Sequence, residues 1–189
     1  EARGWIVEQA GARFFLYIHL FEPHKPYFPM DPYAGEFSQV APPGYRPGIV
    51  VEMVKSMYMG GLVDEEVLER YLAHESDKYD AEVAATDAAI GALFAALEEL
   101  SIREKTLVAI TSDHGEAFGE HGRVAHANSL YDELLRIPLI FVGPGVPEGE
   151  RRAEPVELKD TGRTLLELAH VPGAHRMEGR SLFAEEASA

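Results

Sequence analysis

The sequence contains no cysteine, which excludes several kinds of chemistry at once. A chain of 189 residues without Cys has no disulfide framework, no thiolate metal ligand and no thiol nucleophile of its own. No apolar run approaches the roughly 18 to 20 residues that span a membrane. The opening stretch EARGWIVEQAGARFF also lacks the basic, apolar and cleavage regions of a signal peptide. It has no initiator Met, and we expect a cut or processed beginning.

Basic residues are scarce. The chain has 17 Lys and Arg against 32 Asp and Glu, a formal net charge of −15. This excess argues against nucleic acid or an anionic membrane surface as a main partner. An anionic substrate would need a local positive site, which metal ions and histidines could supply. The hydrophobic fraction of 46% suits one globular domain or a large piece of one.

Short apolar runs alternate with helical patterns along the chain. The runs at 14–20, 105–110 and 137–142 predict strands. Residues 21–48, rich in Pro and Gly, predict a long loop. Strands alternating with helices predict an α/β fold with a mostly parallel sheet flanked by helices. Without an internal repeat or a boundary, we expect a single unit over residues 1–189.

Two helical regions lie between the first two runs. Asp64 is a plausible N-cap for a helix through EEVLERYLAHE. A second stretch over about 77–100 repeats apolar residues at spacings of three and four, which predicts one buried face. That face comprises Tyr79, Val83, Thr86, Ile90, Leu93, Leu97 and Leu100. A last short helix is predicted to start at Asp160.

Two of the predicted strands lead into polar residues. The first is followed by Glu22-Pro23-His24 and the second by Asp113-His114-Gly115. Ligands of parallel α/β sheets bind beyond the carboxyl ends of the strands. If the two strands are parallel neighbours, these segments lie on the same rim of the sheet.

Asp113 and His114 offer one oxygen and one nitrogen ligand for a divalent cation. The alternative is an N-cap Asp beside a hydrogen-bonded His. Two ligands alone would hold a metal poorly, and residues 1–112 supply no obvious carboxylate pair at a strand end.

Histidines in loops are the other candidates. His24, beside Lys25, could contact an anion and transfer protons near neutral pH, or could simply be solvated. His126, thirteen positions after Asp113, could hold an anion or protonate a leaving group. His121 could shape its loop or act as a ligand. Together they suggest a metal-assisted site for an anionic ester.

Several segments together resemble the sulfatase family of the alkaline-phosphatase-like superfamily. They are FFLYIHLFEPHKPY, YDAEVAATDAAIGALFAALEEL, TLVAITSDHGEAFGEHG, HANSLYDELLRIPLIFVGPG and DTGRTLLELAHVPGAHRMEGRSLF. They occur in the family's order and cover most of residues 4–183. The resemblance implies a carboxyl-terminal portion of the catalytic domain, with an alkaline-phosphatase-like and incomplete fold.

The resemblance also implies roles for individual residues. Asp113 and His114 match a pair of late metal ligands, Asp-Asn in many members and Asp-His in a subset. His24 matches a histidine that contacts the sulfate or assists the leaving group. His126 matches the basic position, often Lys, that holds the ester anion, and here it departs from the commonest residue. Substrate contacts are thus expected from His24, Lys25 and His126, and catalysis from the two histidines.

The cofactor implied is a divalent metal. Ca²⁺ is the first expectation, and Mn²⁺ or Zn²⁺ are alternatives because an imidazole ligand suits them at least as well. The expected partners are a small anionic ester and the remainder of the catalytic domain, with no nucleic acid and no membrane span.

One family feature is missing. Members begin with an Asp-Asp metal pair and a Cys-or-Ser-x-Pro-x-Arg motif whose first residue becomes formylglycine, and this sequence has neither. We therefore expect metal-dependent sulfate ester hydrolysis by the parent domain and an inactive isolated chain. The alternatives are a phosphodiesterase, phosphonate monoester hydrolase or phosphoglycerol transferase of the same superfamily, or a non-catalytic binding module.

Overall fold

The computed structural model describes residues 1–9, 11–37, 41–42, 45, 51–127 and 129–183, with the backbone alone at positions 51 and 52. Contacts divide the chain into two compact units. Unit 1 comprises Glu1–Ala96 and Glu116–Leu135, and unit 2 comprises Leu97–Gly115 and Arg136–Ala189. The expectation of a single domain stays a prediction.

The main element of unit 1 is helix α4, Glu65–Glu99. Asp64 caps it as predicted, because its Oδ1 accepts the Val67 amide at 3.0 Å. The predicted second helical stretch is the continuation of this same helix. It ends in a Schellman motif: Ile102 N–H donates to Leu97 O at 3.0 Å, and Ser101, at φ 56°, donates to Glu98 O at 2.8 Å.

The predicted buried face of α4 is only partly buried. Leu97 is buried, but Val83 is 41% exposed. The buried positions of the helix include polar residues that periodicity alone did not pick out: His74, Glu75 and Glu82. A hydrophobic pattern shows which face is apolar, but it does not show which neighbours cover it.

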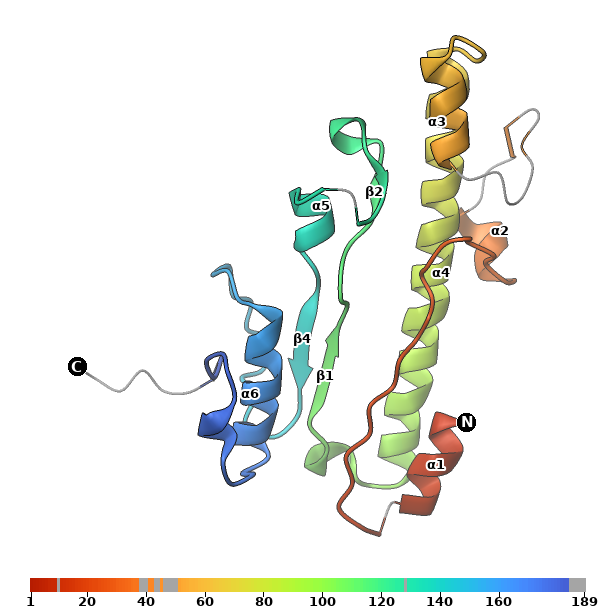
Figure 1. Cartoon of the computed structure of the whole chain (residues 1–189). Helices are drawn as coiled ribbons and strands as arrows, with labels where there is room; N and C mark the ends of the chain where they lie inside the picture. Colours follow the sequence, from red (N-terminus) through yellow and green to blue (C-terminus); the bar gives the residue numbers. More distant parts are fainter. Residues whose placement is uncertain (10, 38–40, 43–44, 46–50, 128, 184–189) are drawn as a thin grey trace. The chain divides into compact units, whose positions relative to one another are not determined.

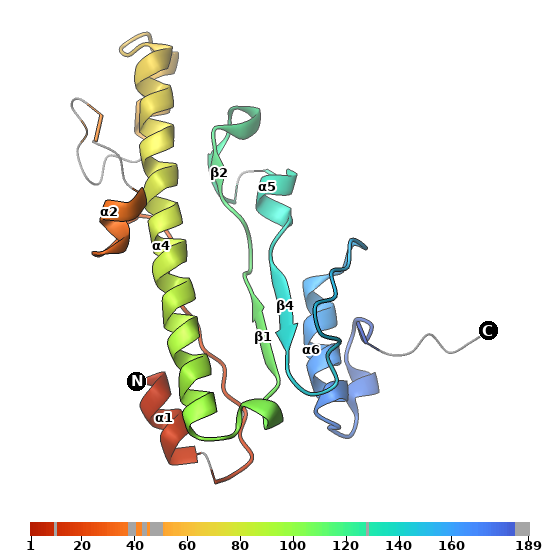
Figure 2. The same cartoon turned by 180° about the vertical axis from the view of Figure 1, so that it is seen from behind.

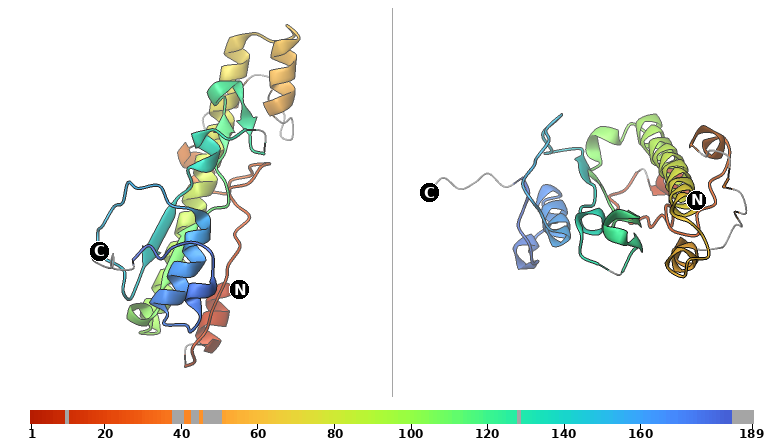
Figure 3. Two further views of the ribbon diagram at one scale, coloured as in Figure 1. Left: turned by 60° about the vertical axis from the view of Figure 1, so that its left-hand side comes forward. Right: turned by 90° about the horizontal axis from the view of Figure 1, so that it is seen from above.

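Three shorter helices belong to unit 1. They are α1 (Ala2–Gln9), α2 (Tyr33–Phe37) and α3 (Val51–Met59). Helix α3 lies beside the first turns of α4 (Figure 3), joined to it by a turn through Gly60 and Gly61. The predicted loop over 21–48 contains α2, and its residues 38–40, 43–44 and 46–48 lie outside the described ones.

The strand predicted at 14–20 is wrong. This segment has no strand assignment; it runs as extended chain along α4 (Figure 1). Phe15 is 81% exposed and Tyr17 is 76% exposed. A strand requires a neighbour that completes its hydrogen-bond ladder, and no described segment pairs with this one.

A tight hairpin in unit 1 leads into the segment that carries His126. Strands β2 (Ala117–Phe118) and β3 (Val124–Ala125) pair antiparallel, with Ala117 opposite Ala125. The turn between them contains the 3₁₀ helix η2 (Glu120–Gly122). The short helix α5 (Asp132–Leu135) follows.

Unit 2 contains the other strand pair. Strands β1 (Val108–Thr111) and β4 (Leu139–Val142) lie side by side (Figure 2), with Val108 opposite Val142. Both were predicted, with ends shifted by up to three residues. The 3₁₀ helix η1 (Arg103–Lys105) precedes β1.

The expected mostly parallel sheet is not seen. Both strand pairs in the described residues are antiparallel. Alternation of strands and helices did not reveal this, because the chain reverses direction between β1 and β4 without a helical crossover of the kind that parallel neighbours need. The inference that two parallel strand ends share a rim therefore has no support here.

Helix α6 (Leu158–Leu168) begins before the position predicted for its start. Glu157 is the N-cap, and Asp160 is the third helical residue of a reciprocal capping box. Asp160 also accepts the Arg180 amide at 2.9 Å, so it ties the helix to the chain that follows the 3₁₀ helix η3 (Ala174–Arg176). In the part of the chain that the structure describes, no helix is long and apolar enough to cross a membrane.

Candidate functional site

His24 is held in place by its immediate neighbours in unit 1. Its ring is half-buried and lies 4.7 Å, centroid to centroid, from the ring of Phe21. Its Nδ1 is 2.7 Å from the backbone carbonyl oxygen of Lys25, a contact in which the ring nitrogen donates. The side chain is therefore oriented by the loop that carries it.

That loop is anchored to α4 by the two residues that follow Pro26. Tyr27 is 3% exposed, and its ring packs edge-on against Tyr79 of α4 with centroids 5.7 Å apart. The Phe28 amide donates to Glu82 Oε1 at 2.6 Å. One buried ring and one charge-assisted hydrogen bond thus fix the loop to a rigid helix.

Burial disfavours the ionised form of the Glu82 carboxyl group. The pKa of its carboxyl group is raised above the usual 4.5, chiefly by burial, although the Phe28 amide lowers it. Its second oxygen, Oε2, is buried and has no hydrogen-bond partner among the described residues. Residues that stay buried at such a cost commonly support a site or a specific conformation.

His126 follows strand β3 and is held by a carboxylate. Its Nδ1 lies 3.0 Å from Glu116 Oε2, and the side chains of His126 and Glu116 are 18% and 4% exposed. Glu116 directly precedes β2 and His126 directly follows β3, next to the paired residues Ala117 and Ala125. The hairpin therefore brings the two residues close together.

The structure brings His24 and His126 together. Their ring centroids are 5.1 Å apart, although the residues are far apart in sequence. Two adjacent imidazoles can contact an anion and move protons near neutral pH. This agrees with the sequence-based grouping of the two histidines, whose roles stay predictions.

Tyr27 interacts with the same carboxylate, that of Glu116. The pKa of its hydroxyl is raised strongly, first by burial and then by the negative charge of the nearby Glu116. The Tyr27 ring is also 6.1 Å from that of Phe118, in β2. The loop of His24 and the hairpin of His126 therefore meet through Tyr27.

Asp113 and His114 follow β1 in unit 2 and are more open. Their side chains are 83% and 38% exposed, and Asp113 Oδ1 lies 3.8 Å from His114 Nε2. Asp113 Oδ1 also accepts the His114 amide at 3.0 Å, but the alternative of a helix N-cap is not seen, because the next element is strand β2. His114 Nδ1 is 2.8 Å from Gly115 O.

The two side chains fit part of a metal site. A carboxylate oxygen and an imidazole nitrogen on the same side of a turn are suitable donors for a divalent cation. In the described ranges, no group of three or more His, Asp and Glu side chains could hold an ion by itself. Asp113 and His114 would therefore need additional ligands.

Lys25 and His121 differ from the histidine pair. Lys25 lies next to His24 and is half-buried, which allows the predicted substrate contact without testing it. His121 stacks on Tyr131 with centroids 3.9 Å apart, and its Nδ1 is 3.0 Å from Glu133 Oε1. His121 thus ties the β2–β3 turn to α5, in line with a loop-shaping role.

Sequence analysis missed the buried partners of these residues. Glu116 and Glu82 were not singled out, since an isolated Glu gives no signal by residue type or spacing that it will be buried. The turn signal of Gly119 and Gly122 could have indicated a hairpin and hence the pairing of Glu116 with His126. No local pattern could have paired Glu82 with Phe28, because they are 54 positions apart.

Another polar cluster lies on α4. Lys78 Nζ donates to Glu75 Oε1 at 3.0 Å and to the Tyr45 hydroxyl at 2.8 Å. The Lys78 ammonium is also 5.9 Å from the centre of the Tyr27 ring. These groups satisfy one another, and the cluster therefore stabilises the helix and its covering loop.

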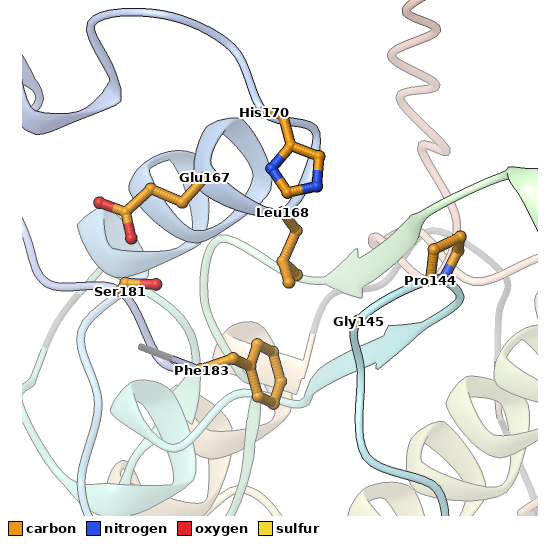
Figure 4. Close-up of a pocket in the computed structure, with 7 residues that line it drawn as sticks. All are labelled: Pro144, Gly145, Glu167, Leu168, His170, Ser181 and Phe183. Atoms are coloured by element: carbon orange, nitrogen blue, oxygen red, sulfur yellow. The ribbon is translucent and has the colours of Figure 1, made fainter. Parts of the chain in front are cut away.

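A pocket of about 220 Å³ lies in unit 2. It is lined by residues of the β4–α6 connection, α6 and the segment after η3 (Figure 4): Pro144, Gly145, Glu167, Leu168, His170, Ser181 and Phe183. The Glu167 carboxylate is paired with Arg163 Nε at 2.5 Å. The pocket contains none of the predicted site residues.

Comparison with known proteins adds independent evidence. Arylsulfatase K of Gallus gallus is 30% identical over 205 residues, which covers 97% of this chain and 38% of that protein. The chain thus spans about two fifths of the length of this relative.

Solved structures agree with that comparison. The phosphonate monoester hydrolase SpPMH from Silicibacter pomeroyi matches with a TM-score of 0.70 and 24% identity, over 95% of this chain and 39% of that one. BT4656, solved in complex with its substrate D-glucosamine-2-N,6-O-disulfate, matches with a TM-score of 0.52 and 27% identity, over 70% of this chain and 26% of that one. The likeness to SpPMH shows a shared fold.

The family model described as Sulfatase matches residues 1–171. This match spans the His24 loop, the β2–β3 hairpin and the Asp113-His114 pair. Together with the arylsulfatase relative, this match shows that the chain belongs to the sulfatase family.

Proposed function

We propose that this chain is the later part of a sulfatase catalytic domain that hydrolyses a sulfate ester with the help of a divalent metal. In this proposal His24 and His126 contact the ester and transfer protons, and Lys25 contributes to anion binding. Asp113 and His114 hold part of the metal. The nucleophile and the other metal ligands would come from the polypeptide that precedes Glu1 in the full-length protein.

The observation that carries this proposal is the pair of imidazoles, 5.1 Å apart, in an otherwise acidic chain. A sulfate ester has negative charge on its non-bridging oxygens and gains charge on the leaving oxygen as the bond breaks. One histidine can donate a hydrogen bond to the sulfate while the other protonates the leaving group. Glu116, which is buried, would keep one of the two rings in a defined orientation.

A divalent metal bound at Asp113 and His114 would polarise the ester and stabilise the developing charge. Sulfatase membership supports such a metal in general. The family resemblance makes Ca²⁺ the first choice, and the imidazole nitrogen of His114 makes Mn²⁺ or Zn²⁺ the alternatives.

A second candidate is hydrolysis of a phosphonate monoester or a phosphodiester. The observation in its favour is His114, since Asp-His rather than Asp-Asn characterises only a subset of the sulfatases that the sequence resembles. The same histidine pair would contact the non-bridging oxygens of a phosphorus ester. The distinction depends on the nucleophile, with Cys or Ser before x-Pro-x-Arg favouring sulfate and Thr favouring phosphoryl transfer.

The first experiment is to sequence the coding region upstream of Glu1 and to assay the full-length protein. An Asp-Asp pair and a Cys-or-Ser-x-Pro-x-Arg motif, with turnover of an aryl sulfate ester above that of an aryl phosphonate monoester, are the expected results. Faster turnover of the phosphonate would favour the second candidate. If translation instead starts at Glu1 and no ester is hydrolysed, the enzyme proposal fails and a binding role becomes the better explanation.

A further inference from the structure

The surroundings of Glu116 contain more than the proposed function uses. Its side chain is 4% exposed, and Oε2 lies 3.0 Å from His126 Nδ1. Its other oxygen, Oε1, is buried without a hydrogen-bond partner among the described residues. A buried carboxylate that stays partly unsatisfied commonly serves a specific contact rather than general stability.

The backbone around the pair is specialised as well. Ala125 and Ala127, which flank His126, both have φ of 64°. This left-handed region is unfavourable for residues with a Cβ, and such positions cluster at functional sites. The chain therefore accepts strain on both sides of the residue that Glu116 contacts.

We propose that Glu116 is a positioning residue that holds the proton of His126 on Nδ1 and thereby makes Nε2 the nitrogen that acts on the substrate. This inference rests on the proposed function for its catalytic meaning, although the placement of the proton stands on the contact alone. A carboxylate only accepts hydrogen bonds, so the imidazole nitrogen facing Oε2 donates. In a neutral ring the other nitrogen is then the basic one.

The hairpin keeps the two partners close. Ala117 pairs with Ala125, and Glu116 and His126 are the residues directly before and after these paired positions. The contact between Glu116 and His126 therefore lies at the open end of the hairpin, where the His126 ring is 5.1 Å, centroid to centroid, from the ring of His24.

The arrangement also accounts for a departure from the family pattern. The resemblance implies that a Lys is common at the position of His126. A Lys ammonium carries its charge and three donors without help, whereas an imidazole has two distinct nitrogens whose proton must be placed. Glu116 supplies that placement.

The test uses the full-length protein with ¹⁵N-labelled histidine. Two-dimensional ¹H–¹⁵N spectra distinguish Nδ1–H from Nε2–H for each ring. Glu116→Met removes the acceptor at similar length, and Glu116→Gln keeps one acceptor oxygen. Glu120→Met is the matched control, because Glu120 accepts the Phe118 amide at 2.6 Å on the same hairpin and has no role in the proposed site. Melting temperatures show which variants fold.

We expect the Nδ1–H form of His126 in the wild type, its loss in Glu116→Met and its partial retention in Glu116→Gln. With an aryl sulfate ester, kcat should fall about 100-fold in Glu116→Met with KM within about twofold, because proton placement acts on the chemical step. Glu116→Gln should recover part of the rate, and Glu120→Met should match the wild type.

Three results overturn the inference. They are an Nε2–H form of His126 in the wild type, an unchanged spectrum in Glu116→Met, or a rate in Glu116→Met equal to that of the wild type. The last would mean that Glu116 only fills space. If the wild type hydrolyses no ester but the spectra behave as expected, placement of the proton by Glu116 is supported and the proposed sulfate ester hydrolysis fails.

Discussion

The two groups of candidate residues are built very differently. His24 and His126 sit in unit 1 on a loop and a hairpin that are anchored by buried contacts to α4 and to Glu116. Asp113 and His114 follow β1 in unit 2 and have local contacts, with the Asp113 side chain 83% exposed. The comparison teaches that the histidine pair is held by contacts within unit 1, whereas Asp113 and His114 offer two donors that would need further ligands to hold a metal.

The largest expected effect is a loss of metal and turnover on substitution in the exposed pair, Asp113 and His114. Asp113→Ala in the full-length protein should lower metal content and turnover together, the latter by well over about 100-fold, because loss of a ligand costs more than loss of an outer-shell partner. Metal analysis and an ester assay measure both. Glu104→Ala, an exposed carboxylate in η1, is the control. Normal metal content in Asp113→Ala would refute the ligand assignment.

The next largest effect is a loss of rate on substitution in the anchored pair, His24 and His126. His24→Ala should lower kcat by about 100-fold, since the variant loses a proton-transfer group, while the metal is retained. Parallel metal analysis and kinetics distinguish this from the previous case. His175→Ala, exposed in η3, serves as control. Full activity in His24→Ala would remove this residue from the site and end the contrast between the two groups.

A smaller effect tests the anchor of the His24 loop. Glu82→Ala leaves the Phe28 amide without its acceptor and should lower the free energy of unfolding by about 1–3 kcal/mol. Urea denaturation measures this, with Glu82→Gln as the variant that keeps an acceptor. An unchanged midpoint in Glu82→Ala would mean that the loop is held by Tyr27 alone.

The raised pKa of Glu82 predicts that the stability of the folded protein depends on pH. Its pKa is raised above 4.5 in the folded protein, so as the pH rises above 4.5 the unfolded state loses this proton first. The stability advantage of the wild type over Glu82→Gln should therefore be largest at pH 4.5 and below, and it should shrink as the pH rises through the folded pKa. An advantage that grows with pH would contradict the direction of the shift.

The smallest effect concerns Asp87. Its place in the helical repeat beside Val83 and Ile90 by itself predicts a packing role and a loss of stability on substitution. The structure shows Asp87 exposed on α4, so Asp87→Ala should change the free energy of unfolding by no more than about 0.5 kcal/mol. Denaturation of this variant beside Glu82→Ala compares an exposed with a buried carboxylate on one helix. A loss as large as that of Glu82→Ala would show that Asp87 is covered in the full-length protein.

Local signals predicted the elements that depend on local interactions. Asp64 as N-cap, the long helix after it and the strands β1 and β4 all follow from capping chemistry and hydrophobic patterns. The same signals failed at 14–20, where an apolar run suggested a buried strand. Strand formation depends on a hydrogen-bonding neighbour, and the sequence of a segment does not contain its neighbour.

For the candidate site, the amino-acid sequence by itself determined which side chains have suitable chemistry, His24, His126, Asp113 and His114, and the family to which they belong. Only the tertiary structure decided that the two histidines meet, and that Glu116 and Glu82 support them. The physical reason is that hydrogen bonds and ring contacts act over a few ångströms in space. Residues far apart in sequence become partners only when a hairpin register or a helix surface brings them together.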